Sequence, residues 1–111
     1  MQQVPGSLRS YLCLYVAAGD VGATALAIAL RGHPTPGLTD LHCYNNRVGD
    51  LGANELGLAL SCNARLRVLS LGGNVIGDSG AVALATGLAD NDTLTELYLF
   101  SNRFNMRPGI F

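Results

Sequence analysis

The sequence predicts an α/β solenoid, in which short parallel strands line one side of the chain and helices line the other. The stretch 66–81 reads LRVLSLGGNVIGDSGA, and 28 residues earlier the stretch 38–53 reads LTDLHCYNNRVGDLGA. A third copy begins 28 residues further on, where 94–102 reads LTELYLFSN. A fixed period of about 20–50 residues is typical of a repeat array, because each unit buries its apolar side against its neighbours.

The first part of each repeat predicts a short strand that ends in an asparagine. Leu69 and Leu71 alternate with other residues, which is the period of a strand, and we expect both to point into the core. Asn74 follows where the chain leaves the strand, and Asn46 and Asn102 occupy the same position in the neighbouring repeats. A stack of these side chains is expected to satisfy the backbone groups of the buried loops.

The second part of each repeat predicts a helix. Asp50 and Asp78 are expected to cap the helices that begin beside them. Leu84 and Leu88 are four residues apart and therefore share one helix face. Gly80 is small, as expected where the helix approaches the layer of strands.

The N-terminal third fits the same template less closely. Aligned without a gap, Tyr11 and Cys13 take the core positions of a strand, and Asp20 takes the position of Asp50 at the start of a helix. A one-residue deletion would place Leu12 and Leu14 in the core instead. The insertion 31–37, RGHPTPG, predicts a loop at the edge of the array, because it holds two prolines and two glycines.

Two other interpretations of the apolar stretch Tyr11–Leu30 stay open. Arg9 before it and Val-Ala-Ala before Gly19 are compatible with a signal peptide. Its length is compatible with a membrane span, but Asp20 would then lie near the bilayer centre, at a cost of about 3 kcal/mol or more. The repeat accounts for more of the residues, and we favour it.

The pattern LxxLxLxxN followed by xIGDxGAxxLAxxL resembles the leucine-rich repeats of the ribonuclease-inhibitor type, which also form the C-terminal horseshoes of NOD-like receptors. The resemblance covers residues 38–102 closely and 8–37 less closely. It implies a short horseshoe segment with a parallel sheet on the concave side and helices on the convex side. It further implies a cytoplasmic receptor or scaffold that recognises a protein, rather than an enzyme.

The predicted organisation is a single domain. Residues 1–7 form an N-terminal tail, and the array covers 8–111, with repeats at about 8–37, 38–65, 66–93 and, in part, 94–111. No polar cap is evident at either end, so we expect either a fragment of a longer protein or open ends that dock on something.

Composition limits the partners. The 111 residues are 49% hydrophobic and 14% charged, with a net charge of −1, which gives no electrostatic basis for binding nucleic acid or a membrane. Gly72-Gly73 precedes no phosphate-binding pattern, and the chain contains no lysine to serve one. We expect no cofactor, no metal and no small-molecule substrate.

The residues with catalytic or ligating chemistry are few. Cys13 and Cys43 fall at the same core position in the ungapped alignment, where a disulfide or a metal pair competes with two small buried thiols in a reducing compartment. We expect the buried thiols, and Cys62 near a helix end is a candidate reactive thiol. His33 and His42 have no nucleophile at a catalytic spacing. The sequence 91–93, Asn-Asp-Thr, matches a glycosylation site, and we interpret it as a polar loop.

The predicted binding surface is the concave side of the sheet, where residues between the core leucines point outward. Exposed aromatic side chains are typical anchors of protein interfaces. The residues predicted to contact a protein partner are Asp40, His42, Tyr44, Asn45, Val68, Ser70, Glu96, Tyr98 and Phe100.

Two further functions stay open. One is a structural subunit whose open ends are buried in a large assembly. The other is a GTPase-activating protein, because Ran GTPase-activating proteins use this type of repeat and need an exposed catalytic arginine. Arg47 and Arg103 follow the loop asparagines, but no motif distinguishes either of them.

Overall fold

The structure is a computed structural model that describes residues 11–13, 19–32 and 38–103. Strands and helices alternate along these residues. In chain order the elements are β1 (Tyr11–Cys13), α2 (Gly19–Gly32), β2 (Asp40–His42), α3 (Asp50–Cys62), β3 (Val68–Ser70), α4 (Asp78–Ala89) and β4 (Glu96–Tyr98).

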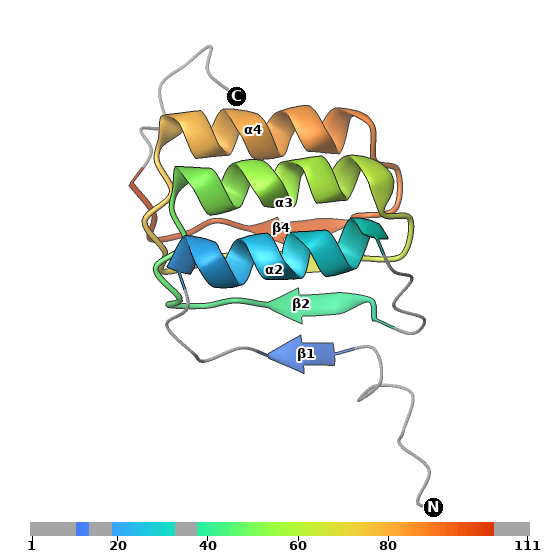
Figure 1. Ribbon diagram of the computed structural model, residues 1–111, viewed down its shortest axis with the longest axis horizontal. Helices are drawn as coiled ribbons and strands as arrows, with labels where there is room; N and C mark the ends of the chain where they lie inside the picture. Colours follow the sequence, from blue (N-terminus) through green and yellow to red (C-terminus); the bar gives the residue numbers. More distant parts are fainter. Residues whose placement is uncertain (1–10, 14–18, 33–37, 104–111) are drawn as a thin grey trace, which may run out of the picture.

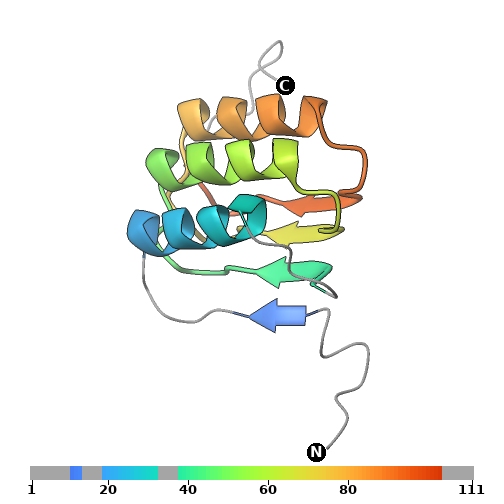
Figure 2. The ribbon, with the colours of Figure 1, turned by 45° about the vertical axis from the view of Figure 1, so that its right-hand side comes forward.

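The strands form one parallel sheet in the order β1-β2-β3-β4, with the helices stacked on one side of it (Figure 1). The turned view shows the same two layers, one of helices and one of strands (Figure 2). Leu41 is opposite Leu69, and Leu69 is opposite Leu97. The 28-residue period is therefore the register of the sheet, and the predicted α/β repeat fold is confirmed.

The core lies between the two layers. Leu41 and Leu69 of the strands are fully buried, as are Leu71 directly after β3 and Leu84 of α4, and Leu56 of α3 is 1% exposed. The leucines at the corresponding positions of the last strand are only partly buried. Burying one such side chain contributes about 1.5–3 kcal/mol, so the middle repeats hold most of the hydrophobic stabilisation.

The predicted asparagine stack is present. Asn74 Oδ1 accepts hydrogen bonds from the backbone N–H groups of Asn46 and Val48, both at 2.9 Å. Its Nδ2 donates to the carbonyl of Cys43 in the preceding repeat and to that of Leu71 in its own, also at 2.9 Å. Asn102 repeats the arrangement one step along the array. Each of the two asparagines therefore satisfies the loop of the repeat before it.

The prediction that each aspartate caps its own helix is wrong. Asp50 Oδ1 accepts from the N–H groups of Gly77 and Gly80, at 2.7 and 2.9 Å, and so caps α4 in the following repeat. Asp20 binds the start of α3 in the same way. A Cβ on Gly80 would lie 2.6 Å from Asp50 Oδ1, so this glycine leaves room for the neighbouring carboxylate rather than for the strand layer.

A second asparagine stack, which the sequence analysis did not predict, lies at the other edge of the array. Asn91 Nδ2 donates to the carbonyls of Leu60 and Asn63, and Asn63 Nδ2 donates to the carbonyl of Leu30. The 28-residue spacing between the two asparagines was the signal that could have revealed it. Asn91 is therefore a structural residue whose amide nitrogen already holds two carbonyls, and this supports the interpretation of 91–93 as a loop.

The first strand departs from the ungapped alignment. Leu12, not Tyr11, lies opposite Leu41, and Cys13 lies opposite His42 rather than at the position of Cys43. The one-residue deletion is thus the alignment that the sheet adopts; Leu14 lies outside the described residues. The predicted loop 31–37 begins later than expected, because α2 extends to Gly32, and residues 33–37 with His33 lie outside the described part.

A candidate protein-interaction surface

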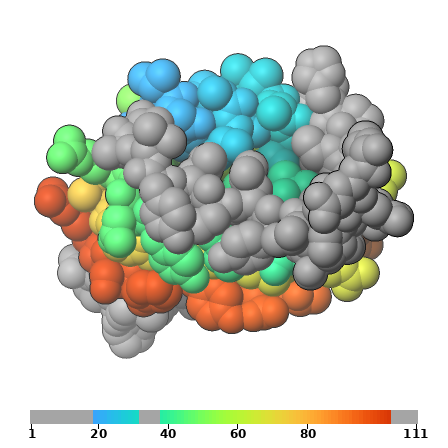
Figure 3. Space-filling view, turned by 90° about the horizontal axis from the view of Figure 1, so that it is seen from below, coloured from blue at the N-terminus to red at the C-terminus, as the bar shows by residue number. Residues whose placement is uncertain are grey.

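The residues that alternate with the core leucines of β2, β3 and β4, together with the loop positions directly after them, form what we call the open sheet face. It lies on the side of the sheet opposite the helices. In the space-filling view from below, α2 and the last repeat lie at opposite borders of the molecule, with residues around β2 between them (Figure 3). All nine residues of the predicted binding surface belong to this face or to the loop edge beside it.

Their exposure differs widely. Phe100 is 56% exposed and Tyr98 is 40% exposed. Asn45 and Glu96 are also exposed, whereas Ser70 is fully buried. The remaining four are partly exposed: Asp40, His42, Tyr44 and Val68. The contact surface that the face offers is therefore concentrated at its two ends, in β4 and at the end of β2.

Three rings form a continuous row across the open sheet face, which we call the aromatic row. The rings of His42 and Tyr44 stack with centroids 5.7 Å apart, and the rings of Tyr44 and Phe100 are 5.8 Å apart and tilted by 35°. Tyr44 and Phe100 come from repeats that are two strands apart, a separation of about 10 Å in a sheet. Their rings are therefore inclined toward each other above the intervening strand.

Gly72 makes that contact possible. It occupies the position of Tyr44 and Phe100 in the repeat between them, and a Cβ there would lie 2.4 Å from Phe100 Cζ. The ring of Phe100 thus lies directly on the backbone of the intervening repeat. The sequence showed a Tyr-Gly-Phe column with a 28-residue spacing, but the contact between its two rings was not predicted.

Tyr98 and Glu96 form a polar pair on β4. The Tyr98 hydroxyl donates a short hydrogen bond to Glu96 Oε1. This hydrogen bond, together with the negative charge of Glu96, raises the pKa of Tyr98 above its usual value. The hydrogen bond therefore keeps the Glu96 carboxylate beside the Tyr98 phenol.

Ser70 lies at the centre of the face, between His42 and Tyr98 in the strand register. Its hydroxyl has no hydrogen-bond partner among the residues that the structure describes, and the residue is 0% exposed. An unsatisfied buried hydroxyl costs about 1–3 kcal/mol. Ser70 therefore lies beneath the surface that a partner would touch, although it was predicted to be part of it.

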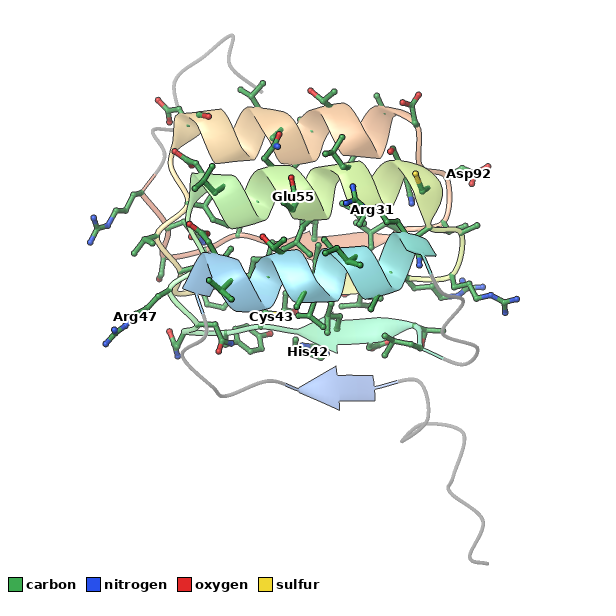
Figure 4. All side chains as sticks on the ribbon, viewed as in Figure 1. Arg31, His42, Cys43, Arg47, Glu55 and Asp92 are labelled. Atoms are coloured by element: carbon green, nitrogen blue, oxygen red, sulfur yellow. The ribbon has the colours of Figure 1, made fainter. Side chains whose placement is uncertain are left out.

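The two arginines at the loop edge are exposed. Arg47 has a positive φ of 59°, and its side chain points away from the array (Figure 4). Arg103 ties its strand to the preceding loop through a backbone hydrogen bond to the carbonyl of Ile76. Neither arginine is close to a carboxylate within the described residues, where the one ion pair joins Arg31 to Glu55 on the helix side.

The thiols and metal ligands form no site in the described part of the chain. Cys43 is buried in the core, whereas Cys62 is exposed and lies 3.7 Å from the Ser61 hydroxyl. No group of three or more His, Cys, Asp or Glu side chains there has the geometry to hold a metal ion. Across the same residues, every helix is too short or too polar to cross a bilayer.

The helix side also exposes apolar side chains, which the sequence analysis did not single out. Val21 is 83% exposed and Leu51 is 73% exposed, and the two line a shallow depression between α2 and α3. A second groove, between α3 and α4, has a volume of about 220 Å³. Its lining residues are Asn54, Gly57, Leu58, Ser61, Ala83, Thr86, Gly87 and Asp90.

Comparisons with known proteins agree with this architecture. A family model described as "Leucine Rich repeat" matches residues 62–85. Among solved structures, the chain is similar to "Leiomodin-1 Actin-Binding Site 2 (ABS2)", with a TM-score of 0.74 and 22% sequence identity over 86% of this chain. The match covers 54% of that chain, so this protein spans about half of its length. No curated protein matches. The family match and the structural likeness together define the fold as a leucine-rich-repeat fold.

Proposed function

We propose that this chain is a protein-interaction module that binds a protein partner through the open sheet face. The observation that supports the proposal best is the aromatic row, in which Tyr44 and Phe100 from separate repeats form one exposed surface. Buried aromatic anchors supply much of the binding energy of protein interfaces. An exposed ring that already packs on its neighbour loses little side-chain entropy on binding.

The array is proposed to be curved, with the open sheet face on its concave side, as in ribonuclease-inhibitor-type repeats. The 28-residue period and the IGDxGA motif support that subtype. We further propose a cytoplasmic location, as part of a longer receptor or scaffold.

Actin is the first partner to test, because the similar solved structure is titled as an actin-binding site. Monomeric and filamentous actin would be titrated against the protein and against Tyr44→Ala and Phe100→Ala. We expect each substitution to weaken binding by about 2 kcal/mol, the scale of an interface anchor, without changing the fold. Thr86→Ala in α4 is the matched control on the helix side and should leave binding unchanged.

A partner other than actin would be sought with a photo-crosslinking residue at position 100, compared with the same residue at position 86. Crosslinks at position 100 that Tyr44→Ala abolishes would support the open sheet face. Crosslinks at position 86 alone, with binding insensitive to Tyr44→Ala and Phe100→Ala, would refute the proposal. That result would favour a structural subunit that is contacted through its helices.

A further inference from the structure

We infer that the partner presents an extended basic segment to the open sheet face, with an arginine side chain stacked on the aromatic row and a second cationic group at Glu96. This inference rests on the proposed function and specifies its ligand. It is supported by the geometry of the rings, by the carboxylates beside them and by the position of Tyr98 between the two.

The aromatic row offers a platform for a flat cation. The centroids of Tyr44 and Phe100 are 5.8 Å apart, and Phe100 is 56% exposed although its other side rests on Gly72. A cation is attracted to the face of an aromatic ring when it lies within about 6 Å of the centroid. A guanidinium stacks on such a face more readily than an ammonium does, because it is planar and more weakly hydrated.

The charges of the open sheet face have one sign. Asp40 and Glu96 lie in the same row of the sheet, on either side of Val68. In the described residues neither carboxylate is within ion-pair distance of an arginine. A face with unneutralised carboxylates and aromatic surface is complementary to a basic partner and unfavourable for an acidic one.

Tyr98 sets the spacing of the two subsites. Its hydroxyl donates a hydrogen bond to the Glu96 carboxylate, and Phe100 follows Tyr98 by two residues, just after β4 ends. Glu96 and Phe100 are four residues apart along the chain, which is a span of about 13 Å in extended form, and side chains i and i+4 of an extended ligand have the same separation. A basic segment in extended form can therefore place one side chain on the rings and a second cationic side chain at the carboxylate.

The test uses a fluorescein-labelled hexa-arginine peptide and its hexa-citrulline counterpart, which has nearly the same shape and no charge. Each is titrated at low salt against the full chain by fluorescence anisotropy. We expect the arginine peptide to bind at least about ten-fold more tightly. Glu96→Gln and Phe100→Leu should each weaken it by about two- to five-fold, the scale of one exposed ion pair or one cation–π contact.

Asp92→Asn is the matched control, since it removes one exposed negative charge from the loop at the far edge of the array (Figure 4). It should leave binding of the arginine peptide unchanged. Equal binding of the two peptides, or equal weakening by Asp92→Asn and Glu96→Gln, would overturn the inference. If the peptides gave either of these results but a partner still crosslinked at position 100, the proposed binding function would hold and only the inference of a basic ligand would be refuted.

Discussion

Asn74→Ala tests whether the asparagine stack stabilises the array as the hydrogen bonds indicate. Asn74 is 4% exposed. Its Oδ1 accepts one hydrogen bond from the backbone N–H of Asn46 and one from that of Val48. Two carbonyls that Asn74 binds would keep another hydrogen-bond donor in the variant. The Leu71 carbonyl also accepts from Asn102 Nδ2, and the Gly72 carbonyl also accepts from the backbone N–H of Asn45. The main loss is therefore the partner of two buried amide groups, together with the hydrogen bond from Nδ2 to the Cys43 carbonyl.

Each unsatisfied buried amide costs about 1–3 kcal/mol, and some water will enter the space that the side chain leaves. We expect Asn74→Ala to lower the free energy of unfolding by about 2–4 kcal/mol. Urea unfolding followed by circular dichroism would measure the change in midpoint. The matched control is Asn54→Ala on the exposed side of α3, which should change stability by less than about 0.5 kcal/mol. Similar losses for the two variants would refute the structural role of the stack.

Four other outcomes are expected. Asp50→Ala should cost about 1 kcal/mol and raise hydrogen exchange at the start of α4 more than in α3, where the residue itself lies. Leu69→Ala should cost about 2–5 kcal/mol in a melting experiment, because the side chain is fully buried. Gly57→Ala should destabilise by about 1–2 kcal/mol despite better helix propensity, since a Cβ would lie 2.4 Å from a carbonyl oxygen of α4. Glu96→Gln should lower the pKa of Tyr98 toward its ordinary value in a spectroscopic titration, because the carboxylate raises it; an unchanged tyrosine titration would contradict the pairing.

The architecture was predictable because the 28-residue period of the sequence determines the register between neighbouring strands. Leucines 28 residues apart must lie side by side in a stacked array, and the paired strands place Leu41 beside Leu69 as the sequence required. The first strand was less determined. Both alignments of Tyr11–Cys13 keep an apolar residue in the core, so sequence alone could not choose between them, and the pairing of Leu12 with Leu41 decides it.

The aspartate caps show why local rules are insufficient here. An aspartate at the start of a helix is normally interpreted as acting on that helix. In this array the N–H groups at the start of α4 are reached by the Asp50 carboxylate of the preceding repeat, which fills the space left by Gly80. Because every repeat carries the same residues, the sequence pattern is identical whether an aspartate caps the helix of its own repeat or the helix of the next repeat. Only the distance between neighbouring helices distinguishes the two.

The candidate site was predicted in its residues but not in its shape. Alternation placed Tyr44 and Phe100 on one face, and it gave a separation of about 10 Å across two strands. It could not indicate that both rings would be inclined over Gly72 until they touch. Nor could it indicate that Ser70 would be fully buried, because burial depends on tertiary packing.

The polar contacts between repeats run in opposite directions, and this links the stability of the array to its surface. Aspartates act forward, since Asp50 caps the helix of the next repeat, whereas asparagines act backward, since Asn74 satisfies the loop of the previous one. An inner repeat therefore needs both neighbours in order to satisfy its own backbone. The aromatic row spans three consecutive repeats, so the rings of Tyr44 and Phe100 are held at a fixed distance only while those repeats are folded together. A partner that binds both rings would in turn stabilise the stacked form, because binding and repeat coupling depend on the same arrangement.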